Sequence, residues 1–185
     1  EEEMKTSKTK KMVLNAILLG LGLVLHQIFP AIAGITPDVA LVMLFCIMIL
    51  NKDDYKTCLV AGIVTGIFTA MATKFPGGQI PNLIDKAVTV NVMFLIMRAV
   101  YLSPIEAKLE RKANSIVVAV MTLFGTVLSG VVFLGSASLI VGLPGEFFAL
   151  FSAVVLPATA VNIVLSVLMI NVITSSLKKT SFQIS

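Results

Sequence analysis

Six long apolar runs constrain the fold of this chain more than any other feature of its sequence. A bilayer needs about 20 apolar residues per helical span, so six spans and their loops use the whole length of 185 residues. With 57% hydrophobic and 13% charged residues, the chain is more apolar than one soluble core of this size can bury. Pro, Gly, Asn or charge clusters separate the runs, which cover residues 12–29, 39–50, 58–73, 87–101, 116–142 and 147–173.

This pattern predicts an all-α, polytopic membrane protein with a bundle of six transmembrane helices. We expect a basic cytoplasmic N-terminus at 1–11, a transmembrane substrate-binding domain at 12–175 and a cytoplasmic tail at 176–185. The first run lacks a small-residue cleavage site and predicts an uncleaved first helix.

The positive charges predict that both termini are cytoplasmic. In that orientation 12 of the 14 Lys and Arg residues fall on the inner side, as the positive-inside rule requires. Only Lys74 and Lys86 fall on the outer side. The inner residues are Lys5, Lys8, Lys10, Lys11, Lys52, Lys56, Arg98, Lys108, Arg111, Lys112, Lys178 and Lys179.

The outer ends of the short middle runs predict a binding cavity. Residues 31–38 and 74–86 are rich in Pro, Gly and polar groups, and irregular backbone at membrane depth persists only where protein buries it or where it lines a cavity. We expect these two segments and residues 135–146 to cover the cavity. No internal repeat is visible, which argues against the inverted-repeat design of many secondary transporters.

Charge near lipid is expensive, so the five outer ionisable residues are candidates for a functional site. They are Asp38, Lys74, Asp85, Lys86 and Glu146. For Asp38 and Glu146 a second interpretation is equally good, because an acid also caps a helix N-terminus favourably.

The segment 74–86 is the most informative. Pro76, Gly77 and Gly78 impose an irregular backbone, and Pro81 is suited to the first position of a helix. The two glycines would let backbone N–H groups approach a ligand closely, and Gln79 follows them. These residues are candidate ligand contacts, although a simple re-entrant turn is the alternative.

After Pro81, helical spacing places Asn82, Asp85, Lys86 and Thr89 on one face of a helix. Lys86 could pair with a ligand carboxylate, and Asp85 or Asp38 with an ammonium, so the cavity suits a zwitterion. Neutralisation of Asp85 by Lys86 within the protein is the competing explanation.

Two further polar residues are candidates for ligand contact. His26 ends the first run and could titrate or hydrogen-bond a ligand, although a structural role is the commoner one. Asn162 lies deep in the last run, where ligand contact and helix-to-helix hydrogen bonding are equally good explanations.

Small residues at a spacing of four permit close helix approach. They occur at Ala16 and Gly20, Gly62 and Gly66, and Gly125 and Ser129. In the first run, after a lysine-rich start, such a pair could instead be the docking face for another membrane subunit.

Several signatures are missing. The sequence has no ATP-binding loop, no HExxH or GxSxG motif and a single histidine, so we predict no enzyme. Cys46 and Cys58 have no metal-binding spacing and are expected to be core residues. We predict no metal site, no cofactor and no nucleic-acid partner.

Two sets of residues resemble known proteins. Residues 10–20, Lys10-Lys-Met-Val-Leu-Asn-Ala-Ile-Leu-Leu-Gly20, resemble the first helix of S components, the substrate-binding subunits of energy-coupling factor (ECF) transporters. Residues 36–38, 51–54 and 75–86, the last reading Phe-Pro-Gly-Gly-Gln-Ile-Pro-Asn-Leu-Ile-Asp-Lys, resemble the TrpP-like tryptophan transporters of Gram-positive bacteria.

The resemblance implies an S component that binds L-tryptophan in the bacterial plasma membrane. It implies partners as well: a transmembrane T subunit, docked on Ala16 and Gly20, and two cytoplasmic ATPases. Gly20 replaces the alanine of the family motif and keeps its spacing. The implied site comprises His26, Asp38, Gly77, Gly78, Gln79, Asn82, Asp85, Lys86 and Asn162, with an aromatic slot from Phe29, Phe75, Phe147 and Phe148.

Two other functions remain open. The chain could be a stand-alone, ion-coupled secondary amino-acid transporter with His26 or Asp85 as the coupling group. It could equally be an S component for a vitamin, which would share the composition and topology.

Overall fold

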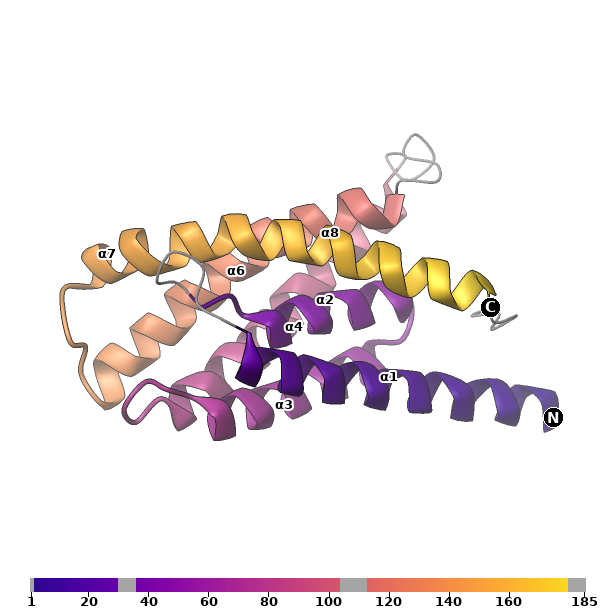
Figure 1. Cartoon of the computed structure of the whole chain (residues 1–185), viewed down its shortest axis with the longest axis horizontal. Helices are drawn as coiled ribbons and strands as arrows, with labels where there is room; N and C mark the ends of the chain where they lie inside the picture. Colours follow the sequence, from indigo (N-terminus) through magenta and orange to yellow (C-terminus); the bar gives the residue numbers. More distant parts are fainter. Residues whose placement is uncertain (1, 30–35, 104–112, 180–185) are drawn as a thin grey trace.

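The computed structural model describes residues 2–29, 36–103 and 113–179, and these residues form six helical columns without a strand (Figure 1). Each column contains one of the six apolar runs, which confirms the all-α bundle. The columns are α1 (Glu2–Ile28), α2 (Val39–Leu50), α3 (Tyr55–Ala72), α4 (Gln79–Leu102), α6 (Ala113–Ile140) and a last one of α7 (Phe147–Leu150), the π-helical turn η2 (Phe151–Val155) and α8 (Leu156–Lys179).

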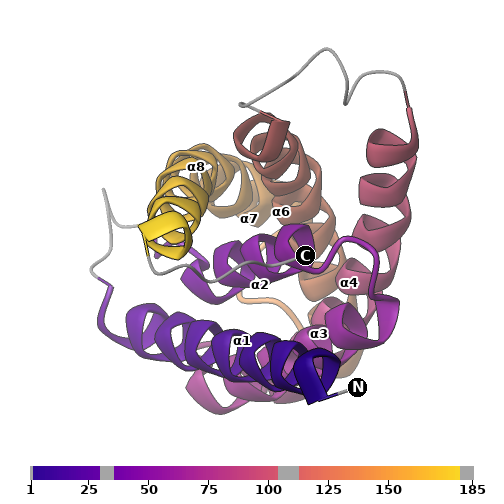
Figure 2. The same cartoon turned by 90° about the vertical axis from the view of Figure 1, so that its right-hand side faces the viewer.

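Helix α2 is the centre of the bundle. Seen end-on, α1, α3, α4, α6 and α8 surround it (Figure 2). All of its residues from Val39 to Ile49 are buried. A helix that has neighbours on every side must be apolar all round, which explains why this run carries no polar face.

The length of α2 determines where polar groups can lie. Its 12 residues span about 18 Å, against about 30 Å for the hydrocarbon core of a bilayer. One end of α2 therefore lies inside the bundle, and Asp38, the residue that caps it, lies there too. The Asp38 side chain accepts a hydrogen bond from the Leu41 N–H at 3.0 Å, so the capping interpretation is correct for Asp38. Glu146 precedes α7, but its side chain makes no capping hydrogen bond.

Four columns are long and apolar enough to cross a membrane by themselves: α1 from Lys8, α3, α6 from Asn114, and the α7–α8 column. Among the described residues, α2 is apolar but short. Helix α4 is not among the four, since it carries Asp85, Lys86 and Arg98.

Helix α4 begins earlier than expected. It starts at Gln79, with Gly78 as its cap, because the Asn82 N–H already donates to the Gly78 carbonyl at 3.0 Å. Pro81 thus lies in the first turn, where N–H groups have no helical partner and its missing donor costs nothing.

Two of the small-residue spacings serve internal packing. A Cβ on Gly62 would come within 2.5 Å of the Val90 side chain of α4, and one on Gly125 would collide with the Phe45 ring of α2. In contrast, Gly20 has no atom of another part of the structure within 4 Å of such a Cβ, and Ala16 is exposed.

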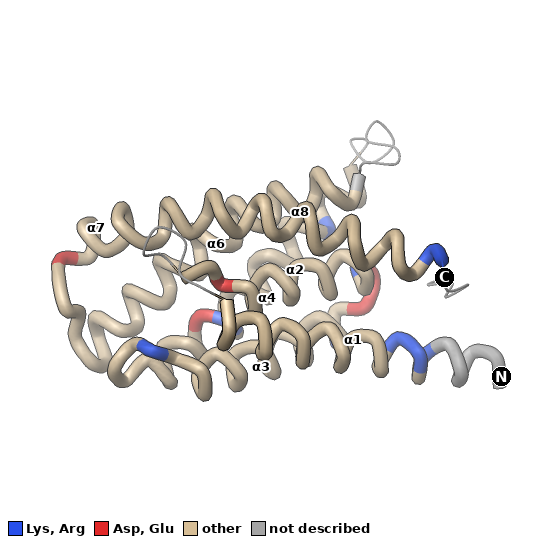
Figure 3. The backbone as a smooth tube through the Cα atoms, viewed as in Figure 1, with Lys and Arg blue, Asp and Glu red and all other residues tan. Residues whose placement is uncertain are grey.

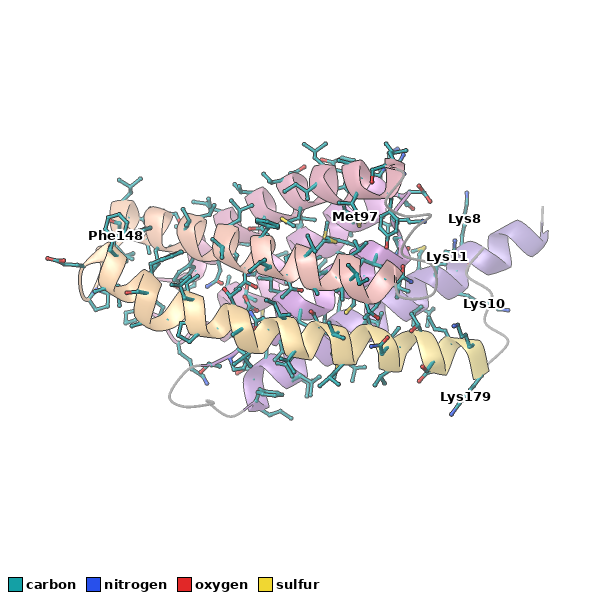
Figure 4. The ribbon with its side chains drawn as sticks, turned by 90° about the horizontal axis from the view of Figure 1, so that it is seen from above. Lys8, Lys10, Lys11, Met97, Phe148 and Lys179 are labelled. Atoms are coloured by element: carbon teal, nitrogen blue, oxygen red, sulfur yellow. The ribbon has the colours of Figure 1, made fainter. Side chains whose placement is uncertain are left out.

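The start of α1 and the end of α8 lie at one end of the bundle, and most of the Lys and Arg of the described residues gather there (Figure 3). Lys8, Lys10, Lys11 and Lys179 project from this end, while Phe148 lies at the opposite one (Figure 4). The predicted basic residues Lys108, Arg111 and Lys112 lie outside the described residues, as do residues 31–35 of the predicted cover and 180–185 of the tail.

Candidate functional site

A cavity of about 400 Å³ lies in the half of the bundle away from the termini. Its lining comes from the last turns of α1 and α3, the cap of α2, the first turns of α4, the later part of α6, and η2 with α8. It forms beside the first residues of α2, because this helix begins inside the bundle while the neighbouring helices extend further in that direction.

Lys86 is the centre of a buried ionic cluster beside this cavity. The residue is 1% exposed, and its Nζ lies 2.6 Å from Asp85 Oδ2 and 2.7 Å from Asp38 Oδ2. It also donates to the Ser129 hydroxyl oxygen at 3.2 Å. A lysine ammonium has three donors, and these three partners use all of them.

Asp85 is enclosed as completely as Lys86. One of its oxygens accepts from Lys86 and from the Ser129 hydroxyl at 2.8 Å, and the other accepts from the Thr89 hydroxyl at 2.9 Å. With 1% of its surface exposed, Asp85 has little access to a ligand. Its neutralisation by Lys86, which we considered as a competing explanation, is what the structure shows.

Asp38 is the member of the cluster that reaches the open space. Its side chain is 25% exposed, and each oxygen accepts one described hydrogen bond, from Leu41 or from Lys86. Asn162 fixes its position, because the Asp38 N–H donates to Asn162 Oδ1 at 3.1 Å. The Asn162 amide in turn donates to Thr126 Oγ1 at 3.3 Å and so joins α8 to α6.

His26 faces the same carboxylate from α1. Its Nδ1 lies 3.5 Å from Asp38 Oδ1, a distance that gives an ion pair only when the ring is protonated. This buried nitrogen has no hydrogen-bond partner among the described residues. When the His26 ring is neutral, the cluster contains the carboxylates of Asp38 and Asp85 and the ammonium of Lys86, so its formal charge is −1.

Six of the nine predicted site residues line the cavity: His26, Asp38, Asn82, Asp85, Lys86 and Asn162. Gly77 and Gly78 do not, because they form the turn before α4, and Gln79, the first residue of α4, does not either. Gly77 has a φ of +72°, and a Cβ on it would come within 2.6 Å of the Val141 side chain. The carbonyl of Gly78 accepts the Asn82 side-chain amide at 2.8 Å, which links the turn to the cavity wall.

The aromatic lining differs from the predicted slot. Phe75 lines the cavity and packs edge to face on Phe133, with ring centroids 5.4 Å apart. Phe147 and Phe148 pack on each other at the bundle end, and Phe148 is 81% exposed. Phe29 lies beside the hydrophobic core. Phe133 was missed because an aromatic residue in an apolar helix carries no positional signal.

Small hydroxyl residues in apolar helices were also missed. The cavity lining includes Thr69, Thr73, Thr126 and Ser129. A hydroxyl in a long apolar run could have signalled them, since such groups face a polar interior more readily than lipid.

No group of three or more metal-binding side chains occurs in the described part of the chain. Cys46 and Cys58 are both buried and unpaired, and the Cys58 thiol donates to the Asn51 carbonyl at 3.4 Å. Their interpretation as core residues is confirmed.

Comparison with known proteins places the chain in a family. Residues 8–178 match the family described as "Tryptophan transporter TrpP". A protein of Clostridium perfringens (strain 13 / Type A), named "Probable tryptophan transport protein", is 44% identical over 177 residues, 95% of this chain and 97% of the relative. A Bacillus subtilis (strain 168) protein of the same name is 44% identical over 179 residues, 95% of this chain and 96% of the relative.

A further relative of that name, from Clostridium acetobutylicum, is 45% identical over 170 residues, 91% of this chain and 94% of the relative. No solved structure matches. Because the match and the relatives each cover nearly the whole chain, it is a member of the family of the tryptophan transporter TrpP.

Proposed function

We propose that this chain binds L-tryptophan in the cavity and serves as the membrane subunit for its uptake. The observation that carries the proposal is Asp38, a part-exposed carboxylate in a cluster that holds two carboxylates for one ammonium and so has one excess negative charge when His26 is neutral. A ligand ammonium would neutralise that charge where water is scarce, which makes the contact strong. The name shared by the relatives supports tryptophan as the substrate.

The cavity also suits the rest of the ligand. Its volume of about 400 Å³ lies within the range of small-molecule pockets. Phe75 and Phe133 offer an aromatic edge and face for an indole ring, and Val154, Val155 and Ala158 add apolar surface.

Each predicted site residue has a proposed role. Asp38 receives the ammonium, with His26 beside it, and Asn162 holds the Asp38 backbone in place. Lys86 and Asp85 fix the orientation of the Asp38 carboxylate. Gly77 and Gly78 shape the turn, and Gln79 begins the helix, that together support Asn82 in the cavity wall.

We propose further that the chain is an S component, with both termini in the cytoplasm of a bacterial cell and the cavity facing outward. It would rely on a transmembrane T subunit and two ATPases, because the sequence holds no ATP-binding motif. Ala16 and Gly20 lie on the surface of α1, where a second membrane helix can approach closely.

The first experiment is a titration of the purified chain with L-tryptophan that follows ligand fluorescence. The chain contains no Trp, so the protein background is low. We expect saturable binding of L-tryptophan, none of leucine, and a loss in Asp38→Asn, with exposed Lys178→Ala as the control. Failure of the wild-type chain to bind would contradict tryptophan as the substrate and favour a vitamin panel.

A second experiment separates binding from coupling. Ala16→Phe and Gly20→Phe should leave the affinity unchanged, since neither site is packed in the bundle, and should abolish uptake in cells. Proteoliposomes with the chain alone should show no concentrative uptake under a proton or sodium gradient. Uptake under those conditions would support the ion-coupled transporter instead.

A further inference from the structure

Lys86 has no proton to offer a ligand carboxylate. Its three N–H donors already serve Asp38, Asp85 and Ser129, and it is almost completely buried. To bind a ligand carboxylate, Lys86 would have to release either buried Asp85 or part-buried Asp38, which is costly. The carboxylate of an amino acid must therefore find its cation elsewhere in the cavity.

Lys74 is the other lysine in the cavity lining, and that lining contains no arginine. It lies on the turn between α3 and α4 and is exposed. None of the ion pairs between described residues involves Lys74. Its ammonium is thus available, whereas that of Lys86 is not.

The backbone around Lys74 is held in place. Thr73 Oγ1 accepts the Phe75 N–H at 3.2 Å, and the Phe75 carbonyl accepts the Gly78 N–H at 2.9 Å. The Phe75 ring packs on Phe133 of α6. A lysine on such a turn loses less backbone freedom on binding than one on an unanchored loop.

The helix lengths place Lys74 outward of Asp38. Helix α2 ends and helix α3 begins at the same short turn near Asn51, so both extend from this turn toward the cavity. Helix α3 has 18 residues, whereas α2 has 12. At 1.5 Å per residue, α3 extends about 9 Å further toward the cavity end than α2 does. The cavity therefore has the negative Asp38 carboxylate at its inner end and the positive Lys74 ammonium at its rim.

We propose that Lys74 binds the carboxylate of the ligand while Asp38 binds its ammonium, which makes Lys74 a specificity residue for α-amino acids. This inference depends on the proposed function. In this assignment Lys86 has an internal role and holds Asp38 and Asp85 in place. The ligand carboxylate is bound by Lys74 at the rim of the cavity and not by Lys86.

A thermodynamic cycle between ligand and protein groups tests the assignment. L-Tryptophan is compared with tryptamine, which lacks the carboxylate, in the wild-type chain and in Lys74→Ala. We expect tryptamine to bind the wild type about two- to fivefold more weakly, as for an ion pair at an exposed site. In Lys74→Ala, L-tryptophan should lose the same factor and tryptamine should lose nothing.

Control variants make the outcome specific. Lys74→Arg should keep the preference for L-tryptophan, and Lys56→Ala, at an exposed site outside the cavity lining, should change neither affinity. Equal losses for both ligands in Lys74→Ala, or none for either, would overturn the role of Lys74 and leave tryptophan binding intact. A wild-type chain that binds neither ligand would overturn the proposed function itself.

Discussion

At the scale of residues, the main polar feature inside the bundle is the ionic cluster of Asp38, Asp85 and Lys86. A buried charge is tolerated only when it is paired and hydrogen-bonded, and the two most buried members of the cluster meet that condition. The least buried one, Asp38, keeps acceptor capacity toward the cavity. A membrane protein retains such a group at a high cost, which is why we place the ligand there.

Lys86→Met should destabilise the fold and not merely weaken binding. The change leaves buried Asp85 and part-buried Asp38 without their counter-ion, so we expect a loss of about 3–5 kcal/mol in the free energy of unfolding. Denaturant unfolding in detergent micelles measures this quantity. Lys74→Met, at an exposed site, should change it by less than about 0.5 kcal/mol, and equal losses in both variants would contradict the internal role of Lys86.

At the scale of elements, glycines set how closely the helices pack. Gly62 lets α3 lie against Val90 of α4, and Gly125 receives the Phe45 ring of α2. Residues 39–49 of α2 are all buried, and the cavity lies at the Asp38 end of this helix. The position of the cavity thus follows from the short length of α2 and the tight contacts beside it.

Gly62→Ala tests this packing. The added methyl would come within 2.5 Å of Val90, and we expect a loss of about 1–3 kcal/mol in the free energy of unfolding. Gly20→Ala is the matched control, because nothing lies within 4 Å and alanine favours the helix. If Gly62→Ala costs as much in a Val90→Ala background as it does in the wild type, the contact is not the cause.

At the scale of the whole molecule, the cavity joins segments from both ends of the chain. Asp38 meets Lys86 across 48 residues and Asn162 across 124. A ligand bound among these side chains would therefore hold several helices together at once. Binding and stability should be linked as in any system where the ligand binds the folded state alone.

L-Tryptophan should accordingly protect the fold. At 100 times its Kd, a single-site ligand adds about 2.7 kcal/mol to the free energy of unfolding. We expect a higher thermal midpoint for the detergent-solubilised chain with L-tryptophan and no change with leucine. A shift that persists in Asp38→Asn would show that the ligand binds elsewhere.

The sequence by itself determined the membrane fold, the six helices and the polar face of Asn82, Asp85, Lys86 and Thr89. All of these follow from local periodicity and from the need to keep apolar surface away from water. Its resemblance to the TrpP-like transporters was enough to identify the family.

Only the tertiary structure decided which polar faces meet. It paired Lys86 with Asp38, supplied Ser129 from α6 and kept Gly77 out of the cavity lining. It also put Phe133 beside Phe75 in that lining, in place of the predicted Phe29, Phe147 and Phe148. These contacts join residues far apart in the chain, and helix packing, which no local pattern encodes, determines them.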